Sequence, residues 1–91
     1  WSFVMFPGGF GTLDEMFEVL TLIQTDKSRP HPVVLVGSEY WGGLVSWMEQ
    51  NMLADGRVSS RDMDLFKVVD GVDAIVAGAT SGLPVPPYGL A

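Results

Sequence analysis

The chain has 91 residues, a formal net charge of −6 and no cysteine; 47% of its residues are hydrophobic and 18% are charged. This length suits one small domain with a single core, and the composition excludes a disordered chain, a disulfide framework and thiolate zinc sites and favours a cytoplasmic location. The five lysines and arginines are scattered singly and no apolar run approaches the roughly 20 residues of a membrane span, so we expect neither nucleic acid nor a membrane as a partner.

The chain opens on the pattern of a β-strand. Residues 2–6 form a continuous apolar run that ends at Pro7 and Gly8, which is typical of a strand buried on both faces of a parallel sheet. Because the first residue is Trp1 and the strand is already under way there, we expect the chain to be the later part of a longer protein.

A helix and a second strand follow. Residues 12–25 are predicted as an amphipathic helix, because their apolar side chains recur at helical spacing: Leu13, Met16, Phe17, Leu20 and Ile23. Prolines in residues 28–32 break this helix, and the β-branched run 33–37 is a second strand that closes with glycine. His31 lies between two prolines, and we expect a loop residue there rather than a metal ligand.

The second helix is predicted between Ser38, as its N-cap, and Gly56, as its stop. The pair Gly42 and Gly43 weakens the first turn by roughly 1 kcal/mol per glycine, which favours a start after that pair. The apolar stripe of this helix consists of Leu44, Trp47, Met48 and Met52.

The last predicted elements are a short helical turn at 59–64, a third strand at 65–69 and a third helix at 72–79, capped by Asp70. Residues 81–91 are rich in proline and glycine and are expected to form a tail. The order β-α-β-α-β-α predicts an α/β domain with a parallel sheet. Three strands are few for such a sheet, so we expect either further strands upstream or a second copy of the chain to cover its edge.

The segment "FPGGFGTLDE" at residues 6–15 places three glycines between a strand and a helix N-terminus. Unpaired backbone amides and the positive end of the helix dipole form an anion site at such a junction, and phosphate is the usual occupant. Asp14 stands where the dinucleotide fingerprint requires its third glycine, and the lysine of the Walker loop is absent. The segment therefore indicates a phosphate site of neither common kind.

An alternative interpretation of the same segment is purely structural. Thr12 and Glu15 fit a capping box, in which both side chains only satisfy the amides of the helix end. A cap alone does not need Gly8, Gly9 and Gly11 together, so the three glycines favour the anion site.

A carboxylate beside a phosphate suggests that the ligand continues into a sugar. Glu15 lies one helical turn in, where it can reach the hydroxyls of a ribose 5′-phosphate, stabilise an oxocarbenium-like transition state or activate a water. Asp14 and Glu18 are interpreted as solvated charges of the first turn, favourable to the helix dipole.

Three further candidates follow the second predicted strand, at the same edge of the sheet as the glycine loop: Glu39, Tyr40 and Trp41. They can line a pocket, with an aromatic ring stacked on a base. Packing in the core or at a subunit interface is the competing and favoured interpretation of the aromatic residues.

Residues 7–15, "PGGFGTLDE", match the signature P-G-G-x-G-T-x-x-E of the LONELY GUY family, the cytokinin riboside 5′-monophosphate phosphoribohydrolases, once labelled "possible lysine decarboxylase". Residues 32–59 and 64–76 also resemble segments of that family, so the resemblance covers residues 1 to about 80. It implies that residues 1–80 are the C-terminal part of a Rossmann-like nucleotide-binding domain, within a larger doubly wound sheet. It also implies a homodimer or higher homo-oligomer with active sites near the subunit interface.

The activity implied by the resemblance is hydrolysis of the N-glycosidic bond of a nucleoside 5′-monophosphate, such as AMP or a cytokinin ribotide, to free base and ribose 5-phosphate. Carried over to this chain, Gly8, Gly9, Gly11 and Thr12 hold the phosphate and Glu15 is the catalytic carboxylate. The family's catalytic arginine and an earlier glycine-rich segment precede the signature. No metal or other cofactor is implied.

Two alternatives and one exclusion accompany this hypothesis. The chain can be a nucleotide-phosphate-binding module without catalysis, or an inactive fragment that only associates with itself. Decarboxylase chemistry on pyridoxal phosphate requires a lysine in the site. Lys27, just past the first predicted helix, and Lys67, inside a predicted strand, are not at the edge where ligands of such sheets bind, so we do not expect that activity.

Overall fold

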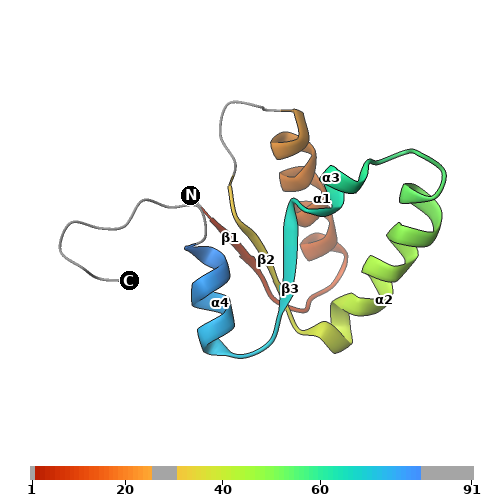
Figure 1. The fold of residues 1–91 in the computed structure, drawn as a ribbon. Helices are drawn as coiled ribbons and strands as arrows, with labels where there is room; N and C mark the ends of the chain where they lie inside the picture. The colour runs from red at the N-terminus through yellow and green to blue at the C-terminus, as the bar shows by residue number, and fades with distance from the viewer. Residues whose placement is uncertain (1, 26–30, 81–91) are drawn as a thin grey trace.

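The computed structural model describes residues 2–25 and 31–80, which form a parallel sheet and its flanking helices (Figure 1). In chain order the elements are β1 (Phe3–Met5), α1 (Phe10–Thr25), β2 (Val33–Val36), α2 (Ser38–Met48), the π-helical turn η1 (Glu49–Leu53), α3 (Ser60–Met63), β3 (Phe66–Val69) and α4 (Val72–Ala79). The predicted alternation of strands and helices is confirmed, and the fold is Rossmann-like. The predicted tail at 81–91 and part of the predicted break at 28–32 lie outside the described residues.

The three strands lie in the order β1-β2-β3, and both neighbouring pairs are parallel. β2 is central, and its residues Val33, Val34 and Leu35 are buried, as its continuous apolar sequence requires. The expectation that residues 2–6 are buried on both faces is wrong. β1 lies at an edge of the sheet, so only Met5 is buried in this strand, and Phe6 is 58% exposed beyond its end.

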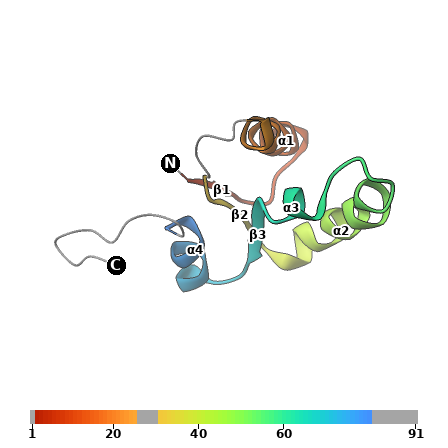
Figure 2. The same ribbon diagram turned by 45° about the horizontal axis from the view of Figure 1, so that its top comes forward.

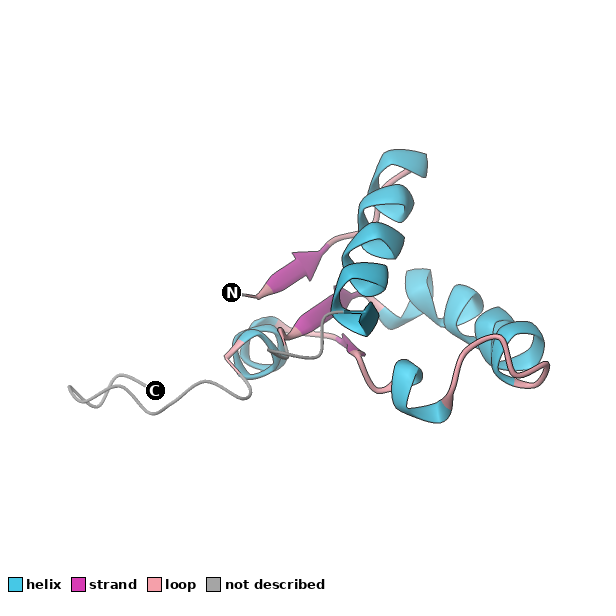
Figure 3. Cartoon of the chain, turned by 90° about the horizontal axis from the view of Figure 1, so that it is seen from above, coloured by secondary structure: helices cyan, strands magenta, loops and turns pink. Residues whose placement is uncertain are grey.

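Helices cover the two faces of the sheet unequally (Figures 2 and 3). α1, α2 and α3 lie on one side, and α4 lies on the other side, where it contacts all three strands. Side chains of β2 alternate between these layers. Val34 meets Gly78 of α4, whereas Leu35 joins the main core on the side of α1 and α2. That core consists of Met5, Met16, Val19, Ile23, Val33, Leu35, Trp41, Met48 and Phe66.

α1 begins two residues earlier than predicted, at Phe10. Its buried residues are Met16, Val19 and Ile23. Phe17, expected on the apolar stripe, is 37% exposed and lies to one side of the buried residues, on the face of α1 that is directed towards α2. The buried stripe thus keeps the predicted Met16 and Ile23 and includes Val19 in place of Phe17.

α2 runs from Ser38 through both Gly42 and Gly43, so the expectation of a start after this pair is wrong. Burial of Trp41 ahead of the pair stabilises the first turn and outweighs the weak helix propensity of glycine. The N-cap is Gly37 rather than Ser38. Trp47, predicted on the apolar stripe, is 54% exposed, whereas Met48 is buried.

α3 is short and is held at its start by a capping box. The Ser59 hydroxyl accepts from the Asp62 amide, and the Asp62 carboxylate accepts from the Ser59 amide. The Gln24 side-chain amide donates to the same carboxylate at 2.9 Å, which ties α1 to α3. These hydrogen bonds, that from Ser59 above all, hold the pKa of Asp62 below its usual value.

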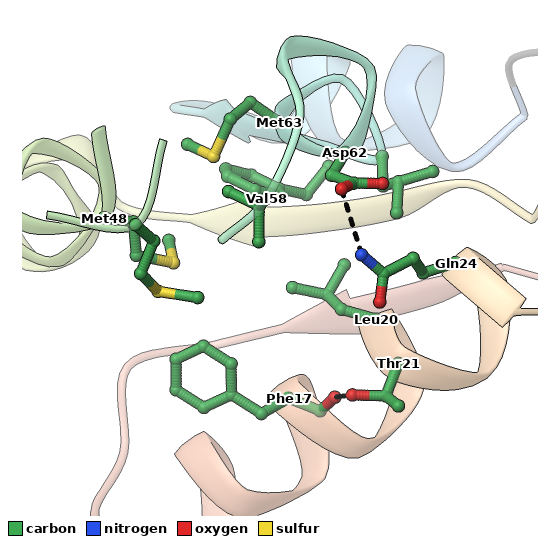
Figure 4. A pocket seen from close by; sticks show the side chains of 11 residues that line it. Phe17, Leu20, Thr21, Gln24, Met48, Val58, Asp62 and Met63 are labelled. Atoms are coloured by element: carbon green, nitrogen blue, oxygen red, sulfur yellow. Dashed lines mark hydrogen bonds between the residues drawn. The ribbon is translucent and has the colours of Figure 1, made fainter. Parts of the chain in front are cut away.

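The Gln24–Asp62 bond closes one side of an apolar hollow of about 110 Å³ between α1, α2 and α3 (Figure 4). Leu20 lies on one side of the hollow, and Met48 and Met63 line the other. Methionine is adaptable enough to pack irregular spaces of this kind. The hollow lies beside the middle and the end of α1, away from the glycine loop.

Candidate functional site

The loop between β1 and α1 carries the glycine-rich sequence. β1 ends at Met5, and the first hydrogen bond of α1 runs from the Leu13 amide to the Gly9 carbonyl at 3.2 Å. The backbone amides that precede Leu13 in the helix therefore have no helical partner, and they point out of the positive end of α1. The strand, loop and helix N-terminus that the anion-site prediction requires are all formed.

Gly8 is a position where the fold itself requires glycine. A Cβ atom at Gly8 would lie 2.1 Å from the hydroxyl oxygen of Thr12 and 2.9 Å from its Cβ. The side chain of Thr12 thus lies directly over the backbone of Gly8. Thr12 and Gly8, two of the residues predicted to hold a phosphate, are in contact with one another.

Gly9 and Gly11 present the opposite situation. A Cβ at either position would meet no atom of the rest of the molecule within 4 Å, and neither residue has the positive φ that favours glycine. Nothing in the described structure therefore requires glycine at these two positions. Both leave open space at the N-terminal end of α1, where a ligand can approach the backbone closely.

The capping-box interpretation of Thr12 and Glu15 is wrong. Because α1 begins at Phe10, Thr12 is already inside the helix and cannot serve as its N-cap. The residue that accepts the first helical bond is Gly9, which has no side chain to cap the helix.

Glu15 is exposed on α1, one turn beyond Gly11. Val19 and Leu22 lie on the same side of the helix as Glu15, and together with Phe3 of β1 they line a shallow hollow. Glu15 therefore lies on the side of α1 that faces away from α2. Asp14 and Glu18 are also exposed.

The interpretation of Asp14 and Glu18 as first-turn charges is wrong, because the early start of α1 leaves its first turn without an acidic residue.

The His31 ring packs edge-on against the Phe3 ring, with 6.4 Å between the ring centroids.

The turn after β2 brings the carboxyl ends of β2 and β3 together. Gly37 has a φ of 105°, a conformation that glycine adopts readily, and its amide donates to the Val69 carbonyl at 2.9 Å. Asp70, directly after β3, accepts from the Ser38 amide at 3.0 Å and from the Ser38 hydroxyl at 2.7 Å. Asp70 therefore satisfies the first turn of α2, and the prediction that it caps the helix at 72–79 is wrong.

The Ser38 hydrogen bonds, that of the backbone amide first, hold the pKa of the Asp70 carboxyl below its usual value of 3.8. The ionised carboxylate is thus the form that binds Ser38. Its stabilising effect is present above pH 3.8 and is lost as the pH falls through the lower pKa of the folded state.

The three candidates after β2 have different environments. Tyr40 is 43% exposed, and its hydroxyl donates a hydrogen bond to the Gly8 carbonyl of the glycine loop. Glu39 is exposed in the first turn of α2. Trp41 is completely buried in the core, and its indole nitrogen has no hydrogen-bond partner among the described residues. The core interpretation of Trp41 is therefore confirmed, and its inclusion in a pocket is wrong.

Asp70 is the residue of this edge that sequence reasoning assigned to the wrong partner. The position of Asp70 in the sequence could have revealed its partner, because Asp70 directly follows β3 as Gly37 directly follows β2. Adjacent parallel strands end at the same edge of a sheet, so residues that follow them are near neighbours. Applied to Ser38 and Asp70, this rule identifies the contact.

The lysines, the potential metal ligands and the helices of the chain bear on other functional classes. Lys67 lies within β3 and is exposed, and Lys27 lies outside the described residues. Within residues 2–25 and 31–80, no three His, Cys, Asp or Glu side chains are grouped as ligands for a metal ion. No helix in that part of the chain is long and apolar enough to cross a membrane.

Residues 1–78 match the protein family described as "Possible lysine decarboxylase". The chain is 41% identical over 87 residues to a cytokinin riboside 5′-monophosphate phosphoribohydrolase of Mycobacterium tuberculosis (strain ATCC 25618 / H37Rv), a match that covers 88% of this chain and 43% of the relative. The protein with the same name from Mycobacterium marinum (strain ATCC BAA-535 / M) is 39% identical over 85 residues, covering 89% of this chain and 43% of the relative.

A more distant relative is a bifunctional cytokinin biosynthesis protein of Fusarium pseudograminearum (strain CS3096). It is 30% identical over 75 residues, which are 82% of this chain and 15% of the relative. The chain thus spans less than half the length of the curated relatives that it matches. The family match over residues 1–78 and these relatives agree with the signature of the glycine loop, and the chain belongs to the "possible lysine decarboxylase" family, the family of the LONELY GUY phosphoribohydrolases.

Proposed function

We propose that the whole protein hydrolyses the N-glycosidic bond of a nucleoside 5′-monophosphate and releases a free base and ribose 5-phosphate. The observation that carries this proposal is the open space at Gly9 and Gly11, which the fold does not need and a phosphate can use. The names of the relatives support the substrate class, since two of them are phosphoribohydrolases of a riboside 5′-monophosphate. A cytoplasmic location, favoured by the lack of cysteine, is part of the proposal.

The phosphate is held by the backbone at the start of α1. The amides from Gly9 to Thr12 donate hydrogen bonds to its oxygens, and the positive end of the helix stabilises its charge. The Thr12 hydroxyl, which lies over Gly8, adds a side-chain donor from the same loop.

Glu15 is the catalytic carboxylate in this proposal. One turn beyond Gly11, it extends from the phosphate towards the ribose. As the bond between C1′ and the base nitrogen breaks, the sugar acquires oxocarbenium character, which a carboxylate stabilises. Water then forms the new bond to C1′, one of its protons goes to the base, and the other becomes the proton of the new C1′ hydroxyl.

The remaining contacts of the substrate come from outside the described residues. The family resemblance implies an arginine and a second glycine-rich segment that precede the signature. Glu15 lies on the side of α1 that faces away from α2, so α2 does not cover that side. We place the additional residues there.

A homo-oligomer, with a dimer as its simplest form, belongs to the same proposal. Among the described residues, eight large apolar side chains are exposed, and five of them are on α1 or α2: Phe10, Phe17, Leu22, Tyr40 and Trp47. Phe10, at the glycine loop, is 92% exposed. A partner that buries apolar surface near this loop agrees with active sites close to a subunit interface.

The decisive experiment is the substitution Glu15→Gln in the whole protein, with AMP and a cytokinin ribotide as substrates. We expect base release to fall about 100-fold or more, the usual contribution of a positioned acid or base, while circular dichroism and thermal unfolding remain those of the wild type. Glu18→Gln, the same change on an exposed residue of the same helix, should retain the wild-type rate. Undiminished release by Glu15→Gln would remove this residue from the mechanism.

Calorimetric titration with AMP distinguishes the hydrolase from a binding module. Tight binding without base release by the wild-type protein would contradict hydrolysis and favour the module. Binding together with release supports the hydrolase.

A further inference from the structure

We propose that Tyr40 is a positioning residue that fixes the orientation of the peptide between Gly8 and Gly9 and thereby raises the affinity of the loop for phosphate. The inference rests on the proposed function, because it names a residue that prepares the phosphate site. Its direct basis is the hydrogen bond from the Tyr40 hydroxyl to the Gly8 carbonyl, which links the turn after β2 to the loop after β1.

Because of the geometry of the peptide bond, this contact with the Gly8 carbonyl also affects the Gly9 N–H, one of the amides proposed to donate to the phosphate. In a trans peptide the carbonyl and the following amide lie in one plane and point in opposite directions. Holding the Gly8 carbonyl therefore fixes the direction of the Gly9 N–H. The next peptide is held as well, since the Gly9 carbonyl accepts from the Leu13 amide at 3.2 Å.

Such a restraint has a large effect on glycine residues, because their backbone is flexible. Gly8 is required by its contact with Thr12, and Gly9 has no side chain that could pack and order the loop. Both residues are conformationally permissive, and ordering them on binding costs more entropy than for other residues. A restraint from a neighbouring element removes part of this cost before the ligand arrives.

Tyr40 is itself held on several sides. Its neighbour Trp41 is completely buried, and the two rings meet edge to face with centroids 5.0 Å apart. Two residues earlier, Ser38 is fixed by both oxygens of Asp70. The start of α2 is thus anchored to the core and to β3, and the phenol extends from this anchored turn to the loop.

A role in packing or in stacking on a base makes a different prediction. Both of those roles use the aromatic ring, which Tyr40→Phe retains, whereas the positioning role uses the hydroxyl. We expect Tyr40→Phe in the whole protein to raise the KM for AMP and the Kd for ribose 5-phosphate about three- to tenfold, the size of one neutral hydrogen bond. The kcat should stay within about twofold, because the restraint acts equally on the bound substrate and on the transition state.

Thr21→Val is the matched control, because it also removes one exposed hydroxyl that donates to a backbone carbonyl, that of Phe17 at 2.7 Å. It should leave KM and Kd unchanged. A KM for Tyr40→Phe equal to that of the wild type, or a loss confined to kcat, would overturn the inference.

A second measurement does not depend on turnover. The ¹⁵N relaxation order parameter of the Gly9 amide should fall in Tyr40→Phe and stay unchanged in Thr21→Val. An unchanged order parameter in Tyr40→Phe would overturn the inference even in an active enzyme. If the wild-type protein neither releases base from AMP nor binds ribose 5-phosphate, the proposed function fails, and the order parameter alone still decides whether Tyr40 orders the loop.

Discussion

Gly8 and Gly11 are three residues apart, yet the structure requires glycine at only one of them. At Gly8 a Cβ would collide with the Thr12 hydroxyl, so the fold excludes every other residue there without a rearrangement. At Gly11 a Cβ would meet nothing within 4 Å. Gly11 lies inside α1, where alanine is the better helix former. Its presence is therefore a cost in stability that a ligand can explain.

Gly11→Ala separates stability from binding. We expect the free energy of unfolding in urea to rise by about 0.5–1 kcal/mol, the difference between glycine and alanine in a helix. In the same protein the affinity for ribose 5-phosphate should fall, because the methyl group occupies the space of the ligand.

Gly43→Ala is the reference for this experiment, since a Cβ there also meets nothing within 4 Å, in the middle of α2. It should stabilise the protein to a similar extent and leave the affinity unchanged. Wild-type affinity in Gly11→Ala would show that the open space is not used by the phosphate.

Tyr40 and Trp41 show which properties of single residues the sequence could reveal. Their position after a strand identified the correct edge of the sheet, because parallel strands end together. Their opposite orientations could not be predicted. The two orientations depend on the rotation of α2 about its axis, and this rotation depends on whether the helix begins before or after Gly42. The low helix propensity of glycine predicted a start after Gly42 and Gly43, and this prediction was wrong.

At the level of elements, α4 packs on the central strand of the sheet through Gly78, which lies against Val34. A Cβ at Gly78 would lie 2.9 Å from Cγ2 of Val34, which is 1% exposed in the central strand. The helix thus lies on β2 with backbone against side chain. Glycine here permits close packing of the two elements.

Gly78→Ala should destabilise the protein by about 1–3 kcal/mol, the usual cost of overpacking a core. The same substitution at Gly43, where there is space, should be stabilising. Urea unfolding of both variants provides the comparison. Combining Gly78→Ala with Val34→Ala should recover part of the loss from the glycine substitution, as a double-mutant cycle detects. Unchanged or increased stability of Gly78→Ala alone would contradict this account of the contact.

The boundaries of the elements were less predictable than their order. The apolar run at the start of the chain resembled that of β2, but burial depends on the neighbours of a strand and not on its own residues. α1 begins at Phe10, two residues before Thr12. The residue that accepts its first helical hydrogen bond is Gly9, which has no side chain to cap the helix. The capping box that the structure does contain is at Ser59 and Asp62, where it begins α3.

For the molecule as a whole, the sheet order β1-β2-β3 leaves β1 and β3 at its two edges. The alternation of strands and helices was sufficient to predict a parallel sheet, since such connections rarely form any other arrangement.

Self-association is the prediction that belongs to this scale. We expect the whole protein to sediment as a dimer or a larger homo-oligomer. Trp47→Glu should weaken the association tenfold or more, because an exposed tryptophan at an interface is a frequent energetic centre. Val72→Glu, on α4 at the opposite face and 74% exposed, should have no effect. A monomer at every concentration would contradict the proposal, and equal effects of both variants would place the interface elsewhere.

The contact of Asp70 with Ser38 has a consequence for the order in which the site is assembled during synthesis. The glycine loop is synthesised before Asp70, and the turn that carries Tyr40 is fastened by this carboxylate, which follows 32 positions after Ser38. Domains generally fold as units during synthesis. A nascent chain that stops before Asp70 contains every residue predicted to bind phosphate and still lacks the fastening of the turn that orders them.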